Sequence, residues 1–140
     1  MNVAAVMAEM GLAYGTLPDV RVYVGAPARI VAPGGDGAVA VVPFPTEVGY
    51  DATYGRGMDT LVIEPMMVLG RPTDRGTVDR LSAYASGGGP GSVKAVLESY
   101  AWTTCHGVRV TGADLDAVQV AGAEYMSIIF RTEVWGPGGN

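Results

Sequence analysis

The chain contains one cysteine and one histidine, and the two are adjacent: Cys105 and His106. A nucleophilic cysteine needs a base within hydrogen-bond reach, but neighbouring residues of an extended segment point to opposite sides. We therefore expect a structural role for this pair. With a single residue of each kind and no CxxC pattern, the sequence also predicts no metal site and no cofactor site.

A glycine-rich stretch at 87–94, GGGPGSVK, superficially resembles a phosphate-binding loop. Such a loop has glycine, lysine and serine or threonine in direct succession, and it follows a strand. Here Lys94 comes three residues after Gly91, and the stretch follows a predicted helix. The sequence therefore predicts a linker between two helices.

Asp114 and Asp116 are two residues apart and would share one face of an extended segment. Two such carboxylates could bind a metal ion or transfer protons. No supporting histidine, asparagine or third acid accompanies them in the sequence. We therefore expect a solvated turn at these positions.

The segment 48–59, VGYDATYGRGMD, is the most informative local pattern. Tyrosine and arginine are typical anchors of protein interfaces, and glycine lets backbones approach closely. Two interpretations remain open: an ordinary hairpin whose tyrosines pack on a sheet, or a contact between subunits. The candidate interface residues, for subunit or tube contacts, are Tyr50, Tyr54, Arg56 and Met58.

Length and composition limit the class of protein. A chain of 140 residues is the size of one domain. Hydrophobic residues make up 49% of it and charged residues only 16%, against a usual share of about 25%. With 21 glycines and 9 prolines, the composition excludes a coiled coil, a highly charged disordered chain and an all-helical bundle. So few charges suggest that copies of the chain cover part of the surface.

The net charge of −5 argues against nucleic-acid binding through a basic surface. No basic segment precedes an apolar stretch at the N-terminus, and the longest apolar run is far shorter than the roughly 18–20 residues that span a bilayer. We expect no signal peptide, no membrane partner and a reducing, aqueous compartment.

Periodicity, caps and turn residues predict the elements. Helices are expected at 2–12, 75–85 and 92–100, and strands at 20–24, 38–42, 59–69, 108–111, 117–120 and 124–135, with a hairpin turn at 121–123. Asn2 and Ser92 are expected to cap two of the helices. This order predicts an α+β fold: a mostly antiparallel sheet with an N-terminal helix and two short helices packed on one face. It forms one domain over residues 1–135, followed by a flexible tail at 136–140.

Three local expectations follow. Helix 75–85 is expected to turn Val78, Leu81 and Tyr84 inward. Strand 59–69 is apolar on both faces, so both faces are expected to be covered. Pro65 has no N–H group and places that strand at an edge or at a bulge.

With these patterns in view, the chain resembles the small neck proteins of tailed bacteriophages that infect actinobacteria. It looks most like a tail terminator of a long, non-contractile tail, that is, a siphovirus. The resemblance covers about residues 3 to 135 and is carried by the N-terminal amphipathic helix and by residues 20–23, 50–59, 68–75, 81–85, 91–97 and 118–134.

This resemblance implies a non-enzymatic virion protein that forms a ring, usually a homohexamer. The ring caps the last ring of the tail-tube protein and then joins the tail to the head-side connector or stopper protein. Each subunit would give apolar edges or loops to its neighbour, and DNA would pass through the ring without sequence-specific binding. The expected location is the virion tail or neck, with the host cytoplasm during assembly.

The alternatives belong to three classes. The nearest is a head-closure or connector protein of the same neck, which favours a β-barrel with fewer helices. The others are a small enzyme with a carboxylate site, such as Asp114 and Asp116, and a ligand-binding domain.

Overall fold

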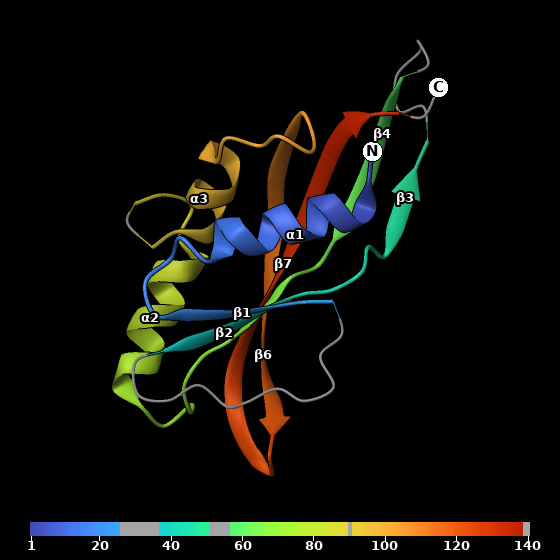
Figure 1. Cartoon of the computed structure of the whole chain (residues 1–140). Helices are drawn as coiled ribbons and strands as arrows, with labels where there is room; N and C mark the ends of the chain where they lie inside the picture. The colour runs from blue at the N-terminus through green and yellow to red at the C-terminus, as the bar shows by residue number, and fades with distance from the viewer. Residues whose placement is uncertain (26–36, 51–56, 90, 139–140) are drawn as a thin grey trace.

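The structure is a computed structural model that describes residues 1–25, 37–50, 57–89 and 91–138 (Figure 1). The elements in chain order are α1 (Val3–Tyr14), β1 (Val20–Val24), β2 (Ala38–Val42), β3 (Glu47–Gly49), β4 (Met58–Ile63), β5 (Met66–Val68), α2 (Arg75–Ala85), α3 (Val93–Ser99), β6 (Gly107–Val120) and β7 (Ala123–Pro137). The predicted α+β class is confirmed, including the N-terminal helix. None of the described helices is long and apolar enough to cross a membrane.

The described strands form one seven-stranded sheet in which β1 and β2 pair in parallel and the other pairs are antiparallel. Strand β7 is central. One of its edges bonds β6 along most of its length, and the other bonds first β5 and then β4. The sheet thus has a five-stranded section, β1-β2-β5-β7-β6, and a four-stranded section, β3-β4-β7-β6.

The predicted strand at 59–69 is divided at Glu64 and Pro65 into β4 and β5. Pro65 lies in the gap, where a missing N–H removes no ladder bond. Its carbonyl still accepts the Phe130 N–H at 2.9 Å. The prediction of one continuous strand is therefore wrong, but the irregularity lies at the proline, where the sequence placed it.

The main core lies on the face of the sheet that carries the helices. The residues predicted to share this face of 59–69 are all buried: Leu61, Ile63, Met67 and Leu69. The same core contains buried side chains of α1, α3 and β7. The alternation thus continues across Pro65, because two residues of irregular backbone preserve the period of two.

The opposite face of the sheet carries a smaller buried cluster: Val39, Val41, Val68 and Val120. The prediction that both faces of 59–69 are covered holds at Val68 in β5. In β4, Thr60 and Val62 remain half-exposed on this face. This side of the sheet is therefore only partly covered by the described residues.

Helix α1 begins as predicted, since Asn2 Oδ1 accepts the Ala5 N–H at 3.0 Å. It continues two residues beyond the predicted end, so Gly11 lies inside the helix. A Cβ at Gly11 would lie 2.6 Å from Val24 Cγ2. Gly11 therefore allows α1 to pack closely on β1, and the helix ends at Gly15.

Helix α2 has the predicted bounds but a different inward face. Tyr84 is buried and Leu81 is partly buried against the core, whereas Val78 is 58% exposed. In that turn of the helix the buried residue is Thr77, which lies against Gly70. A Cβ added at Gly70 would clash with the Thr77 hydroxyl. Tertiary packing has rotated the helix so that a small polar residue replaces the apolar one.

The hairpin between β6 and β7 has the predicted turn. Ala121 and Gly122 have positive φ, 51° and 81°, and they join the paired residues Val120 and Ala123, as in a type I′ turn. The expected separate strands at 108–111 and 117–120 are one strand of 14 residues, β6, with a bulge between 110 and 112.

Strand β7 continues through Pro137, two residues beyond the predicted domain end. Gly136 pairs with Asp59 and Pro137 with Met58. The ends of the predicted loop 48–59 also belong to strands, in β3 and β4. Most of the turn-rich segment 25–37 lies outside the described residues.

Candidate functional site

Two of the four predicted interface residues are described, Tyr50 and Met58, whereas Tyr54 and Arg56 lie outside the described residues. Tyr50 directly follows β3 and is 76% exposed. Met58 opens β4, is half-buried and pairs with Pro137. Because β3 and β4 are paired, Tyr50 and Met58 flank the same end of this hairpin. Their role as an interface stays a prediction.

Cys105 and His106 differ in burial, although they are neighbours in the chain. Cys105 is buried, and its pKa is raised, first by burial and then by the negative charge of Glu9. His106 is exposed, and its backbone N–H donates to the Trp135 carbonyl at 2.9 Å. A buried, protonated thiol is a poor nucleophile, which fits the expected structural role.

The glycine-rich stretch joins α2 to α3, as predicted. Its lysine is engaged within the chain. Lys94 Nζ lies 2.5 Å from Glu98 Oε2 and 3.5 Å from the Val110 carbonyl. The ammonium group therefore stabilises the contact between α3 and β6.

The expected turn at Asp114 and Asp116 is wrong, because both residues lie in β6. Both are exposed on the same face of the strand. Asp116 Oδ1 accepts the N–H of Ala117 at 2.8 Å. Within the described residues, no three histidine, cysteine, aspartate or glutamate side chains gather as a metal site would require.

A buried carboxylate that the sequence patterns did not single out joins α1 to the segment before β6. Glu9 accepts hydrogen bonds from the backbone and hydroxyl groups of Thr103 and Thr104, at 2.6–3.2 Å. Burial alone would raise the pKa of Glu9, but these bonds outweigh it and lower the pKa to about 2. No short-range signal could have revealed this contact, since the partners are 94 and 95 residues apart.

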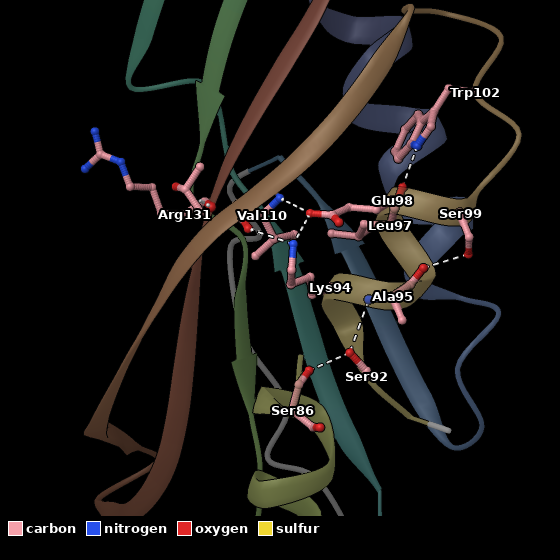
Figure 2. Close-up of polar contacts among 11 residues, drawn as sticks. Ser86, Ser92, Lys94, Ala95, Leu97, Glu98, Ser99, Trp102, Val110 and Arg131 are labelled. Atoms are coloured by element: carbon pink, nitrogen blue, oxygen red, sulfur yellow. Dashed lines mark hydrogen bonds and ion pairs between the residues drawn. The ribbon is translucent and has the colours of Figure 1, made fainter. Parts of the chain in front are cut away.

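The outer edge of β6 is capped near its start by α3 (Figure 2). The Val110 N–H donates to Glu98 Oε2 at 2.9 Å, and the Val110 carbonyl accepts from Lys94. The hydrogen bond from Lys94 is the largest influence on Glu98 and lowers the pKa of its carboxyl. One ion pair thus satisfies both polar groups of an edge residue, which is one way in which proteins protect sheet edges.

Beyond the bulge, no other described strand pairs with the same edge of β6. The Phe130 N–H bonds to Pro65, and Met126 exchanges hydrogen bonds with Leu69 and Gly70, so these β7 residues direct their backbone groups away from β6. Their register partners in β6 therefore direct their own backbone groups outward. These outward residues are Ala113, Leu115 and Ala117, and we call this stretch, residues 113–117, the β6 edge.

A hollow of about 180 Å³ adjoins the β6 edge on the helix side of the sheet. It lies between Ala85 and Ser86 at the end of α2, Lys94 of α3, residues 110–113 of β6 and Phe130. A free edge beside a pocket is the arrangement by which sheets bind an added strand, since the backbone gives affinity and the pocket receives a side chain.

The opposite end of the five-stranded section is also open within the described residues. The Asp19 carbonyl and the Gly25 N–H bond to β2, and backbone groups alternate along a strand. Val20, Val22 and Val24 therefore direct their N–H and C=O groups outward. We call this stretch, Val20–Val24, the β1 edge.

No protein-family model matches the chain, and no curated protein matches it.

Proposed function

We propose that the chain is a structural protein of a bacteriophage virion, a tail terminator that works by self-association. Copies of the chain form a ring, usually a hexamer, that caps the tail tube of a long-tailed phage of actinobacteria. The ring then joins the tail to the head-side connector. It performs no catalysis, and its chemistry is the burial of apolar surface and the pairing of backbone groups between copies.

The observation that carries this proposal is the pair of open strand edges at opposite ends of one sheet section. A strand edge is a template for another strand, and two different edges on one molecule favour a head-to-tail contact. The exposed apolar residues near these edges, Leu115 and Val24, support the same reading. The sparse charge of the whole chain agrees with it.

The nearest alternative is a head-closure or connector protein of the neck. That class favours a β-barrel with fewer helices. An open sheet with three described helices favours the terminator over it.

Electron microscopy of the purified protein, alone and mixed with tail tubes, tests the proposal. We expect rings that seat on one end of the tube. Tubes whose two ends stay bare at saturating protein would contradict the function.

The predicted interface residues give a second test in the same assay. Charge reversal at Arg56 together with Tyr54→Ala is expected to abolish ring closure or tube capping. Unchanged assembly of this double variant would remove these residues from the interface.

A further inference from the structure

We propose that copies of this chain join by strand addition: the β1 edge of one copy pairs antiparallel with the β6 edge of the next. In this register Val22 of one copy lies opposite Leu115 of the other, and Arg21 lies opposite Asp116. The inference deepens the proposed function by naming the subunit contact, and it rests on that function only for the ring.

The backbone groups of the two edges match in number and spacing. Each edge is five residues long and presents three residues whose N–H and C=O groups point outward: Val20, Val22 and Val24 on one, and Ala113, Leu115 and Ala117 on the other. Full overlap places each outward residue opposite another, as an antiparallel ladder requires. A shift toward the bulge would bring the added strand against the Val110 groups that α3 already occupies.

Strand direction is also consistent. Strand β1 runs parallel to β2, and each later step from β2 through β5 and β7 to β6 is antiparallel. Strands β1 and β6 therefore run in opposite directions within one copy. A second copy in the same orientation then places its β1 antiparallel to the β6 edge of the first, so every copy in the assembly faces the same way.

The side chains are complementary on the helix side of the sheet. Register partners run across the five strands from Val22 to Leu115, through Ala40, Met67 and Ile128. Because directly opposite residues share a face, Val22 of one copy and Leu115 of the next meet on this side. Leu115 is 52% exposed, and the pairing would cover it.

The opposite side is complementary in charge. A second row of partners runs from Arg21 to Asp116, through Val39, Val68 and Ser127. Arg21 is exposed at one end of this row and Asp116 at the other. In the joined sheet they lie side by side, and opposite charges at such a pair stabilise the ladder.

The hollow beside the β6 edge accounts for one further exposed side chain. In the same register Val24 lies opposite Ala113, which lines the hollow. Val24 contacts α1 at Gly11, so it is on the helix side of its own copy, yet it is 49% exposed. Strand addition directs it toward the hollow of the next copy.

Asp116 also explains why the β6 edge would select one particular strand and reject others. Its carboxylate accepts the Ala117 N–H at 2.8 Å, which is a group that an added strand needs. Charged residues at an edge oppose unspecific pairing. An arginine opposite Asp116 draws the carboxylate away from the edge, so the pair selects this partner.

Disulfide trapping tests the register. Arg21→Cys and Asp116→Cys are combined in a Cys105→Ala background. In the proposed contact these positions form a non-hydrogen-bonded pair with Cα atoms about 4.5 Å apart, which suits a disulfide. Within one copy they are four strand spacings apart, roughly 19 Å, so any bond must join two copies. We expect a ladder of multimers under mild oxidation that ends at a fixed, closed number.

The matched control is Arg21→Cys with Asp114→Cys in the same background, shifted by two residues along the same face. We expect at least a tenfold lower yield of multimers from it. Equal yields from the two pairs, or no ladder from the Asp116 pair at millimolar chain concentration, would overturn the proposal.

A charge exchange gives a second measurement. Arg21→Asp and Asp116→Arg should each weaken self-association at least threefold by sedimentation, and the double exchange should restore it. Failure of the double exchange to restore association would contradict the pairing. If the Arg21→Cys, Asp116→Cys variant forms rings that cap tail tubes but its subunits are not cross-linked after oxidation, this contact is refuted and the proposed function stands. If the cross-linked rings form but do not bind tail tubes, the contact stands and the proposed function is refuted.

Discussion

Replacing Glu9 with glutamine tests the account of how α1 is held to the sheet. Glu9 is 8% exposed, and four donors from Thr103 and Thr104 converge on its two carboxylate oxygens. Glutamine keeps the shape but replaces one acceptor oxygen with an NH₂ group. That group faces donors with which it cannot bond.

The magnitude follows from the pKa. The carboxyl has a pKa of about 2 in the folded protein against an ordinary value of 4.5, which corresponds to about 3 kcal/mol of stability. Because the folded pKa is lowered, this stability is present above about pH 4.5, and it is lost as the pH falls. The loss amounts to about 2 kcal/mol by about pH 3 and about 3 kcal/mol by about pH 2.

Urea unfolding measured from neutral pH to about pH 2 provides the assay. We expect Glu9→Gln to unfold with about 3 kcal/mol less free energy than the parent at neutral pH. The difference should shrink as the pH falls, since the parent loses the charge that the variant lacks. The matched control is Glu47→Gln, the same change at an exposed residue of β3, which should alter the free energy by less than about 0.5 kcal/mol.

Two results would refute this reasoning. One is a neutral-pH loss in Glu9→Gln no larger than in the Glu47 control. The other is a difference between Glu9→Gln and the parent that stays constant across the acid range, because the carboxylate would then carry no pH-dependent stability.

Three smaller perturbations test other contacts by the same unfolding assay. Gly11→Ala places a Cβ 2.6 Å from Val24 Cγ2 and should cost about 1–3 kcal/mol through overpacking; a stabilised variant would show that α1 can move away from β1. Ser92→Ala removes the cap of α3 and should cost about 1 kcal/mol, with Ser92→Asn as the variant expected to retain stability. Glu98→Gln weakens the acceptor for the Val110 N–H and should cost about 1 kcal/mol, and the loss should shrink at acid pH, where the parent carboxyl also becomes neutral.

Short sequence patterns correctly predicted the caps, strands and turn that depend on neighbouring residues. The caps at Asn2 and Ser92 form as expected, and the strands Val20–Val24 and Ala38–Val42 have the predicted bounds. The turn at Ala121 and Gly122 also forms. In each case a few neighbouring residues fix the backbone, so a short window of sequence holds the whole cause.

The predictions were wrong where the conformation of a residue depends on a partner outside its own helix or strand. Residues 112–116 contain glycine, alanine and aspartate, which disfavour strands, yet pairing with β7 makes them part of β6. The rotation of α2 that buries Thr77 and exposes Val78 depends on the space beside Gly70. In both cases the partner belongs to another element or to the segment before the helix, and the periodicity of one helix or strand does not show it.

The candidate site shows the same division. The sequence shows few charged residues, from which we inferred that copies of the chain cover part of the surface. Its residue patterns placed the candidate interface in segment 48–59. The open β1 and β6 edges were not predicted, because being an edge is not a property of a strand's own residues.

Amino-acid order by itself determined the α+β class, the caps, the turn and the apolar faces, since these depend on residues three, four or two positions apart. Tertiary structure alone decided which strands are neighbours, which carboxylate is buried and which strand edges have no partner strand within the described residues. The physical reason is that pairing between strands joins residues far apart in the chain, and the same five residues can lie inside a sheet or at its border.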